Sequence, residues 1–117
     1  EEVYDYRDFF CRSHDLPLPP EVCKYQFEIP FMIWMSDTYR RNRPDVAAQV
    51  AGALDRPFSA DDLSHLLLDL AGIRCRWYDP ARSLIGERFD TTRPRPLLMG
   101  FEPAGNYETI IGRDRKQ

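Results

Sequence analysis

The sequence is poor in the residues from which disulfide frameworks and metal sites are built. Its 117 residues include three cysteines, Cys11, Cys23 and Cys75, and two histidines. Three cysteines do not make a disulfide scaffold, although one bridge, between Cys11 and Cys23 for example, remains open. Cys11 and His14 have the spacing of half a zinc site, but four ligands are needed and His65 lies in a helical pattern. We therefore expect no metal ligands in this chain.

The sequence also lacks a basic excess and a long apolar run. Lys and Arg total 16 against 19 Asp and Glu, which gives a net charge of −3. A nucleic-acid-binding surface normally shows the opposite balance, so we expect no nucleic-acid partner. The longest apolar run, Ile29–Met35, is far shorter than the roughly 20 residues that cross a bilayer. We expect no membrane span within this chain.

Apolar residues are nevertheless frequent enough to form a core. Hydrophobic residues make up 43% of the chain and aromatic residues 13%, which suits one domain or a large subdomain. The sequence shows no initiator Met, and Tyr4, Tyr6, Phe9 and Phe10 follow closely on its first residue. Four aromatic side chains need a surface to cover. These features predict a fragment of a larger fold, one that self-associates when isolated.

Residues 11–35 predict a loop followed by a buried strand. Three prolines in the stretch 11–20 predict an ordered surface loop, which carries His14. From Tyr25 to Met35 the sequence alternates and then becomes continuously apolar, as a strand covered on both faces does. Ser36 and Asp37 are predicted to end the strand and cap a helical turn.

Two helices are predicted next. Residues 42–53 have Pro44 near the first helical position and valines at helical spacing. Residues 61–71 begin with acidic side chains, end before Gly72 and carry a leucine stripe that faces a core. His65 and Asp69 lie four residues apart on the other side, where we expect a solvated or locally hydrogen-bonded pair.

The last third of the sequence gives weaker signals. Ile73–Tyr78 alternates as a short strand does, although a packed loop would look similar. Residues 91–117 predict a wrapping tail with a hairpin and fraying over the last five residues. Trp34 and Trp77 have apolar or aromatic neighbours, so we expect both to be packing residues.

Several motifs together resemble a known enzyme family. They are, in order, Glu-Glu-Val-Tyr-Asp at 1–5, Arg-Ser-His at 12–14, Phe-Glu-Ile-Pro-Phe-Met-Ile-Trp-Met-Ser at 27–36, and the stretch from Pro57 to Ile73. Over roughly residues 1–90 the order and spacing are similar to the C-terminal part of sulfatase-fold phosphoethanolamine transferases. These enzymes modify lipid A and the lipopolysaccharide core at the periplasmic face of the bacterial inner membrane.

The resemblance implies an α/β fold, namely a C-terminal fragment of an alkaline-phosphatase-like sandwich. This fragment would have a few strands, two covering helices and an irregular tail. Residues 1–24 would form an active-site loop region, 25–90 the strand and helix core, and 91–117 a wrapping tail. The partner implied for the chain is the remainder of its own catalytic domain.

The resemblance also implies a reaction. In such enzymes a zinc-activated Thr takes phosphoethanolamine from phosphatidylethanolamine and passes it to a glycolipid acceptor through a covalent intermediate. The Thr and the zinc ligands precede the part that this chain resembles, so the chain alone would be inactive and hold no cofactor. His14 is the one implied substrate-site residue, close to the phosphoryl group, and a loop histidine without that role is the alternative. Arg12 would contact phosphate or simply lie at the surface.

Two alternatives stay open at this point. Sulfatases and phosphoglycerol transferases share the fold, and the nucleophile that separates the reactions lies outside this chain. A non-catalytic interaction module, binding a partner through Tyr4, Tyr6, Phe9 and Phe10, is the other reading. The acceptor, the oligomeric state and the cysteine pairing are not determined by the sequence.

Overall fold

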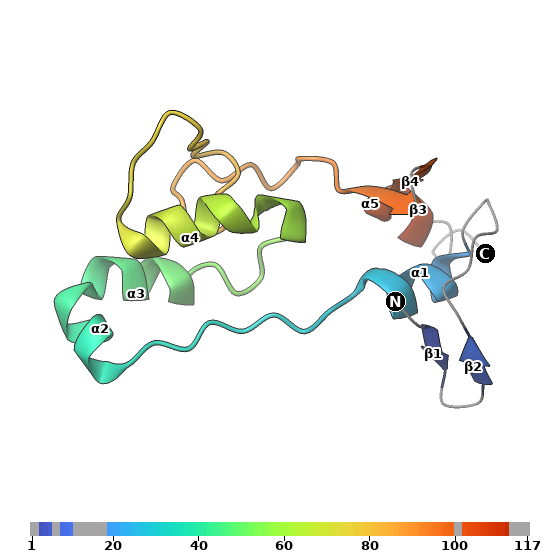
Figure 1. Ribbon diagram of the computed structural model, residues 1–117, viewed down its shortest axis with the longest axis horizontal. Helices are drawn as coiled ribbons and strands as arrows, with labels where there is room; N and C mark the ends of the chain where they lie inside the picture. The colour runs from blue at the N-terminus through green and yellow to red at the C-terminus, as the bar shows by residue number, and fades with distance from the viewer. Residues whose placement is uncertain (1–2, 6–7, 11–18, 100–101, 113–117) are drawn as a thin grey trace. The chain divides into compact units, whose positions relative to one another are not determined.

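The computed structural model is mainly helical, with two small antiparallel sheets (Figure 1). It describes residues 3–5, 8–10, 19–99 and 102–112. The described residues form two compact units, one from 1–31 with 94–117 and the other from 32–93. The elements in chain order are β1 (Val3–Asp5), β2 (Asp8–Phe10), α1 (Pro20–Phe27), α2 (Asp37–Asn42), α3 (Pro44–Ala51), the 3-10 turn η1 (Ala60–Asp62), α4 (Leu63–Ala71), β3 (Pro96–Met99), β4 (Glu102–Asn106) and α5 (Tyr107–Ile111).

In the unit formed by both ends of the chain, α1 replaces residues 25–27 of the predicted strand. Pro20 occupies the first helical turn, Glu21 lies at the positive end and Lys24 in the last turn. Each of these positions favours a helix. The buried strand predicted over Tyr25–Met35 is therefore wrong in this structure, because α1 continues to Phe27 and residues 28–36 have no regular secondary structure.

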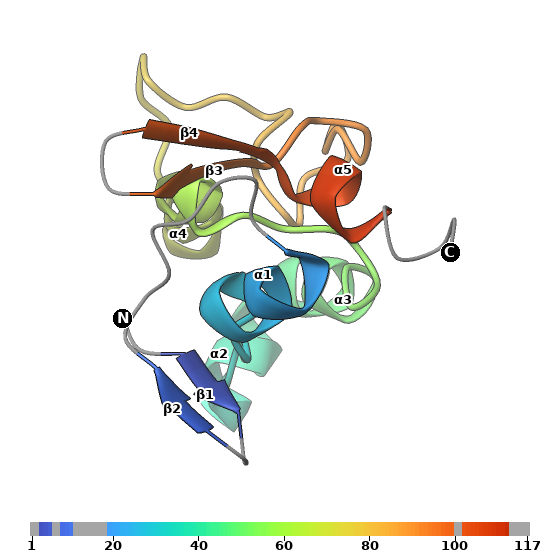
Figure 2. The same cartoon turned by 90° about the vertical axis from the view of Figure 1, so that its right-hand side faces the viewer.

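Two antiparallel hairpins belong to the same unit (Figure 2). Val3 pairs with Phe10 across β1 and β2. Pro96 pairs with Asn106 across β3 and β4, and the register shifts between Leu97 and Leu98. The hairpin predicted in the tail is thus confirmed, whereas α5, which follows it directly, was not foreseen.

Cys23 on α1 and Ile110 on α5 form the small core of this unit, and both side chains are fully buried. The Tyr107 backbone N–H donates to the Arg95 carbonyl at 2.9 Å and so fixes the start of α5. Burial raises the pKa of the Cys23 thiol, and the nearby Glu28 carboxylate adds to the effect. Cys23 is a free thiol that acts as a small apolar core residue.

The second unit, residues 32–93, is built on α2, α3 and α4. Ser36 caps α2 by accepting a hydrogen bond from the Tyr39 N–H at 3.1 Å, as predicted. The Tyr39 hydroxyl donates to the Leu70 carbonyl at 2.5 Å and so ties α2 to the end of α4. Gly72 ends α4 in the left-handed conformation at φ 70°, which glycine adopts without strain.

The core of this unit joins the helices to an irregular segment. Its fully packed members are Val46, Ala53, Leu66, Leu84 and Ile85. The Arg56 guanidinium donates to the Leu84 and Gly86 carbonyls at 2.7 and 2.9 Å and holds that segment in place. Of the two alternatives predicted for Ile73–Tyr78, the short strand is wrong and the loop is confirmed, since residues 73–93 contain no helix or strand.

Both tryptophans lie at the surface. Trp34 is 83% exposed and Trp77 is 70% exposed. The prediction that they are packing residues is wrong, because most of each indole is exposed. The Arg76 guanidinium stacks over the Trp77 ring at 4.2 Å, which shields one face of the indole only.

Candidate functional site

The predicted substrate-site residue, His14, lies outside the described residues, as do Arg12 and Cys11. Polar side chains among the described residues gather instead on one face of α4 and of the η1 residue Asp62 that precedes it. Asp62, His65 and Asp69 follow one another at spacings of three and four residues, so they share a side of the helix. All three are buried, with 4%, 7% and 8% of their surfaces exposed. We call them the α4 polar face.

Asp69 is the most heavily bonded carboxylate of this face. Its Oδ2 accepts a hydrogen bond from the Tyr78 hydroxyl at 2.8 Å and another from the Ser83 hydroxyl. Its Oδ1 accepts one from the Arg74 guanidinium at 2.6 Å. Burial alone would raise the pKa of Asp69, but the hydrogen bonds from Ser83, Tyr78 and Arg74 outweigh it and hold the pKa below its ordinary value. Asp69 is therefore a fixed carboxylate anion.

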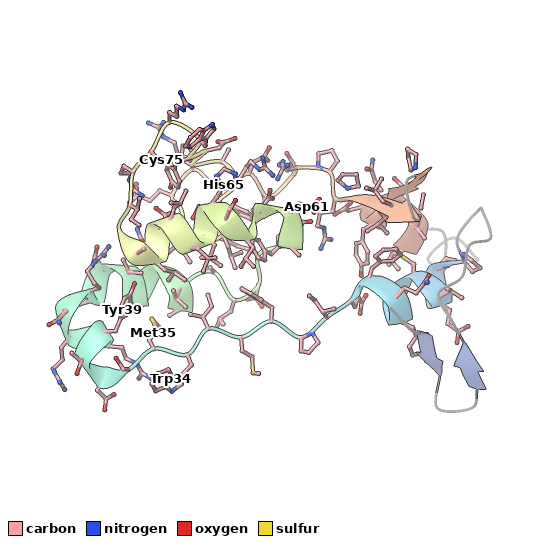
Figure 3. The ribbon with its side chains drawn as sticks, viewed as in Figure 1. Trp34, Met35, Tyr39, Asp61, His65 and Cys75 are labelled. Carbon is pink, nitrogen blue, oxygen red and sulfur yellow. The ribbon has the colours of Figure 1, made fainter. Side chains whose placement is uncertain are left out.

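His65 faces the same loop, one turn earlier on α4. Its Nδ1 accepts a hydrogen bond from the Asp79 backbone N–H at 3.0 Å, which places the ring proton on Nε2. The ring lies 6.3 Å from that of Tyr78, centroid to centroid. Figure 3 shows His65 on the side of α4 from which the loop carrying Cys75 rises. The imidazole serves as an acceptor for the turn that begins at Asp79.

Asp62 holds the far end of the loop. Its Oδ1 accepts from the Arg82 Nε at 2.6 Å, and its Oδ2 pairs with the Arg93 guanidinium. The Arg82 side chain is 31% exposed and that of Arg93 34%. Two half-buried guanidinium groups therefore neutralise one buried carboxylate, an arrangement in which loss of the carboxylate leaves two unpaired cations.

We expect Asp62→Asn to lower the free energy of unfolding by about 2 kcal/mol, because one acceptor oxygen and the negative charge between two arginines are lost. Asp61→Asn is the matched control, since Asp61 is adjacent, exposed and bonded to Arg82 only through its backbone carbonyl. Urea-induced unfolding of both variants measures the difference. Equal stabilities would show that the two arginine contacts do not hold the loop.

The α4 polar face is a structural network, because its carboxylate oxygens and the His65 Nδ1 already accept hydrogen bonds from other residues of the chain. Asp69 has three donors, Asp62 has two, and the one acceptor nitrogen of His65 is bonded to the backbone. Of the two alternatives expected for His65 and Asp69, solvation is wrong because both residues are buried. Both side chains are hydrogen-bonded, to the following loop and not to each other. The role of this face is structural: its hydrogen bonds and ion pairs hold residues 74–93 against α4.

The other unit has a smaller polar arrangement around α5. The Tyr107 hydroxyl donates to the Glu28 carboxylate, and the Arg95 guanidinium pairs with Glu108. Burial, together with the hydrogen bond to the Glu28 anion, raises the pKa of Tyr107 to about 12. Burial would raise the pKa of Glu108, but the Arg95 hydrogen bond outweighs it and lowers the pKa. These contacts join the end of α1 to β3 and α5.

The part of the chain that the structure describes contains no cluster of three His, Cys, Asp or Glu side chains suited to a metal ion. Cys75 is an exposed free thiol. None of the helices in that part has the length and apolar character needed to cross a bilayer.

Comparison with known proteins identifies the enzymes to which the chain is related. Over 94 residues, 80% of the chain, it is 33% identical to phosphoethanolamine transferase EptC of Escherichia coli K12. Its curated homologues are phosphoethanolamine transferases. Phosphoethanolamine transferase CptA of Salmonella typhimurium is 32% identical over the same length of chain. The aligned region spans only 15% of each of these relatives.

Phosphoethanolamine transferases were the family indicated by the sequence motifs, so that resemblance is confirmed. The other comparisons add nothing to it. No protein-family model matches this chain. No solved structure matches it significantly. The alkaline-phosphatase-like sandwich thus stays a prediction, and the structure itself supports a mixture of helices and small antiparallel sheets.

The residues that bind Asp69 in this homologue of the phosphoethanolamine transferases were not predicted from the sequence. Arg74, Tyr78 and Ser83 follow Asp69 at distances of five, nine and fourteen residues, which correspond to no helix or strand period. One signal was present, namely two acidic residues and a histidine at helical spacing. Leu66 is buried on the same side as these residues, whereas Leu63 and Leu67 of the leucine stripe are exposed. When polar residues recur at helical spacing and the segment after the helix is rich in arginine and tyrosine, the pattern indicates that this segment binds the polar residues.

Proposed function

We propose that the chain is the C-terminal part of the catalytic domain of a phosphoethanolamine transferase. The whole enzyme would move phosphoethanolamine from phosphatidylethanolamine to a lipopolysaccharide or other glycan acceptor. The observation that supports this proposal is the 33% identity to a phosphoethanolamine transferase over 80% of the chain. The enzyme would act at the periplasmic face of the bacterial inner membrane, anchored by segments outside these residues.

Zinc and a nucleophilic Thr belong to the proposed enzyme and not to this chain. Among the described residues no donor set fits zinc, so no step of the reaction is assigned to a metal held here. His14 is the one residue of the chain proposed to contact substrate. It would donate a proton or a hydrogen bond to the phosphoryl or leaving oxygen.

The contribution proposed for the described residues is to the scaffold. In the proposed alkaline-phosphatase-like fold, residues 1–24 form an active-site loop region, 25–90 the core and 91–117 the tail. The α4 polar face fastens the loop 74–93 by hydrogen bonds and ion pairs. A rigid support of this kind keeps a catalytic centre in register with its substrate, where displacements of about 1 Å are costly.

The experiment is to express the longer polypeptide that contains this chain in Gram-negative cells and to weigh their lipid A and core oligosaccharide by mass spectrometry. A gain equal to one phosphoethanolamine group, lost on zinc chelation, supports the proposal. Purified residues 1–117 should show no transfer with or without zinc. An unmodified acceptor, or sulfate ester hydrolysis by the longer polypeptide, would overturn the assignment.

His14→Gln in the longer polypeptide tests the role of the one proposed site residue. We expect activity to fall by about 100-fold, as loss of a general acid or an oxyanion donor does, with an unchanged melting temperature. Asp15→Asn is the matched control, a neighbouring polar change with no assigned role. If both variants retain full activity, His14 is a loop histidine and does not contact the phosphoryl group.

A further inference from the structure

His65 holds the loop after α4 through a hydrogen bond that requires a neutral imidazole. The residue is 7% exposed, and its Nδ1 accepts the Asp79 backbone N–H at 3.0 Å. A ring nitrogen that accepts a hydrogen bond carries no proton, whereas an imidazolium ring carries a proton on both nitrogens and can only donate. A second proton on the His65 ring would therefore bring two donors face to face, and the bond to Asp79 would be lost.

The loop partner of His65 is a small turn, residues 79–82, that holds its own shape. The Ala81 N–H donates to the Asp79 carboxylate at 2.9 Å, and the Arg82 N–H donates to the Asp79 carbonyl at 3.1 Å. Residues 71–77, which lead into this turn, are exposed along their whole length, and Figure 3 shows Cys75 on the part of the loop that rises from α4. The turn is therefore able to move away from the helix without losing its internal hydrogen bonds.

The charged and titratable groups around His65 lie on η1, α4 and the loop. Those on η1 and α4 are Asp61, Asp62 and Asp69, and those on the loop are Arg74, Tyr78, Asp79, Arg82 and Arg93. The carboxylates of Asp62 and Asp69 already accept bonds from the loop, so neither replaces His65 as the acceptor for the turn. Burial would raise the pKa of Asp69, but its hydrogen bonds hold that pKa below the ordinary value. Asp69 therefore stays an anion, and keeps its own contacts to the loop, over the range in which histidine side chains titrate.

We propose that His65 is a pH-sensitive latch that holds the turn 79–82 against α4 while its imidazole is neutral. When a proton from solvent binds Nδ1, the acceptor becomes a donor and the turn is released. The latched form binds one proton fewer than the released form, so the latched form is favoured at higher pH and is lost as the pH falls. The Asp69 contacts stay in place, which limits the opening to a local movement. This latch is independent of the proposed transfer reaction.

Hydrogen exchange of the Asp79 amide, resolved by NMR in the full chain over a series from about pH 7.5 to about pH 5.5, tests the latch. The ring nitrogens of His65 are followed in the same samples. After correction for the intrinsic chemical rate, we expect protection of the Asp79 amide to fall by at least about 10-fold as the ring takes up its second proton. The Ile73 amide, which donates to the Leu68 carbonyl at 2.8 Å, is the control and should keep its protection.

Any of three results in this series would overturn the latch. Constant protection of Asp79 while the ring titrates would show that the bond does not require a neutral ring. A ring that stays neutral down to about pH 5.5 would leave nothing to trigger the release. An equal loss of protection at Ile73 would indicate general unfolding instead of a local opening.

Two variants, His65→Gln and Tyr78→Phe, separate the effect of the proton from the loss of a contact. Glutamine has a side-chain oxygen that accepts an N–H at every pH, so we expect His65→Gln to lose the pH dependence of protection at Asp79. Tyr78→Phe removes the hydroxyl bond to Asp69, and we expect weaker protection at every pH with the pH dependence retained. An unchanged pH dependence in His65→Gln, or its loss in Tyr78→Phe, would refute the latch. The parent series decides the question alone if His65→Gln does not fold.

Discussion

Replacing Asp69 by alanine is expected to lower the free energy of unfolding of the chain by about 3 kcal/mol, enough to melt a marginal domain. The change removes the acceptor for three donors. Ser83, whose side chain is fully buried, loses the acceptor of its hydroxyl, and an unsatisfied buried polar group is expensive. The Tyr78 hydroxyl loses its acceptor as well. Arg74, 65% exposed, is solvated by water and adds little.

Urea-induced unfolding followed by circular dichroism gives the measurement. Asp55→Ala is the matched control, because Asp55 is an exposed aspartate of the same unit, and we expect a change below about 0.5 kcal/mol. A loss of similar size in both variants would mean that the Asp69 hydrogen bonds have no special weight. A loss confined to Asp69→Ala would identify the carboxylate as the anchor of residues 74–93.

The depressed pKa of Asp69 has a consequence for the pH dependence of stability. A carboxyl group whose pKa is lower in the folded than in the unfolded chain stabilises the fold above the unfolded value, and that contribution is lost as pH falls through the folded value. The unfolded value is about 3.8. We therefore expect the stability advantage of the parent chain over Asp69→Asn to shrink as the pH is lowered from about 5 to about 2.

Leu66→Ala is expected to cost about 3 kcal/mol. Leu66 is 1% exposed and packs with Val46, Leu84 and Ile85 at the centre of the 32–93 unit. Truncation to alanine removes apolar contacts and leaves a cavity between α3, α4 and the irregular segment. Rigid packing on three sides limits the collapse that would reduce the cost.

Leu67→Ala is the control for this prediction, since Leu67 is the next residue of α4 and is 54% exposed. We expect a change below about 1 kcal/mol, because alanine has the higher helix propensity and little buried surface is lost. Urea-induced unfolding separates the two variants. If Leu67→Ala were the more damaging change, the leucine stripe would face a partner through Leu67 in solution.

The sequence predicted those elements whose signals agree with one another. At α4 the acidic start, the leucine spacing and the final glycine all indicate the same helix, and the structure has it. The Ser36 cap and the position of Pro44 were likewise foreseen. Helix α2, however, is short and has no apolar stripe, so its presence depends on contacts such as the Tyr39 bond to Leu70, which no local pattern contains.

The errors lie where two local signals compete or where a layer is absent. Over residues 25–27 the alternation of aromatic residues favoured a strand, whereas Pro20 and the placement of charges over 20–27 favoured a helix, and the helix formed. Over 28–36 the apolar run was read as buried on both faces. Ile33 and Met35 are half-buried, whereas Met32 and Trp34 are exposed, because burial depends on neighbours that the segment's own sequence does not specify.

The candidate site was predicted less well than the fold. His14 came from a family resemblance and lies outside the described residues. The α4 polar face depends on hydrogen bonds to residues five to 31 positions further along the chain, in a loop without periodic structure. Such contacts depend on the path of the backbone, so the residues that form them cannot be identified before that path is known.

The division of the chain into two units also predicts the order in which they fold during synthesis. Residues 32–93 are continuous, so this unit has all its partners once Arg93 has left the ribosome. The other unit joins 1–31 to 94–117, and the Cys23 side chain stays without Ile110 until Ile110 itself has been synthesised. Because domains fold as units during synthesis, the unit formed by 32–93 would form before the unit that joins 1–31 to 94–117, with the Cys23 thiol accessible to oxidants in the interval.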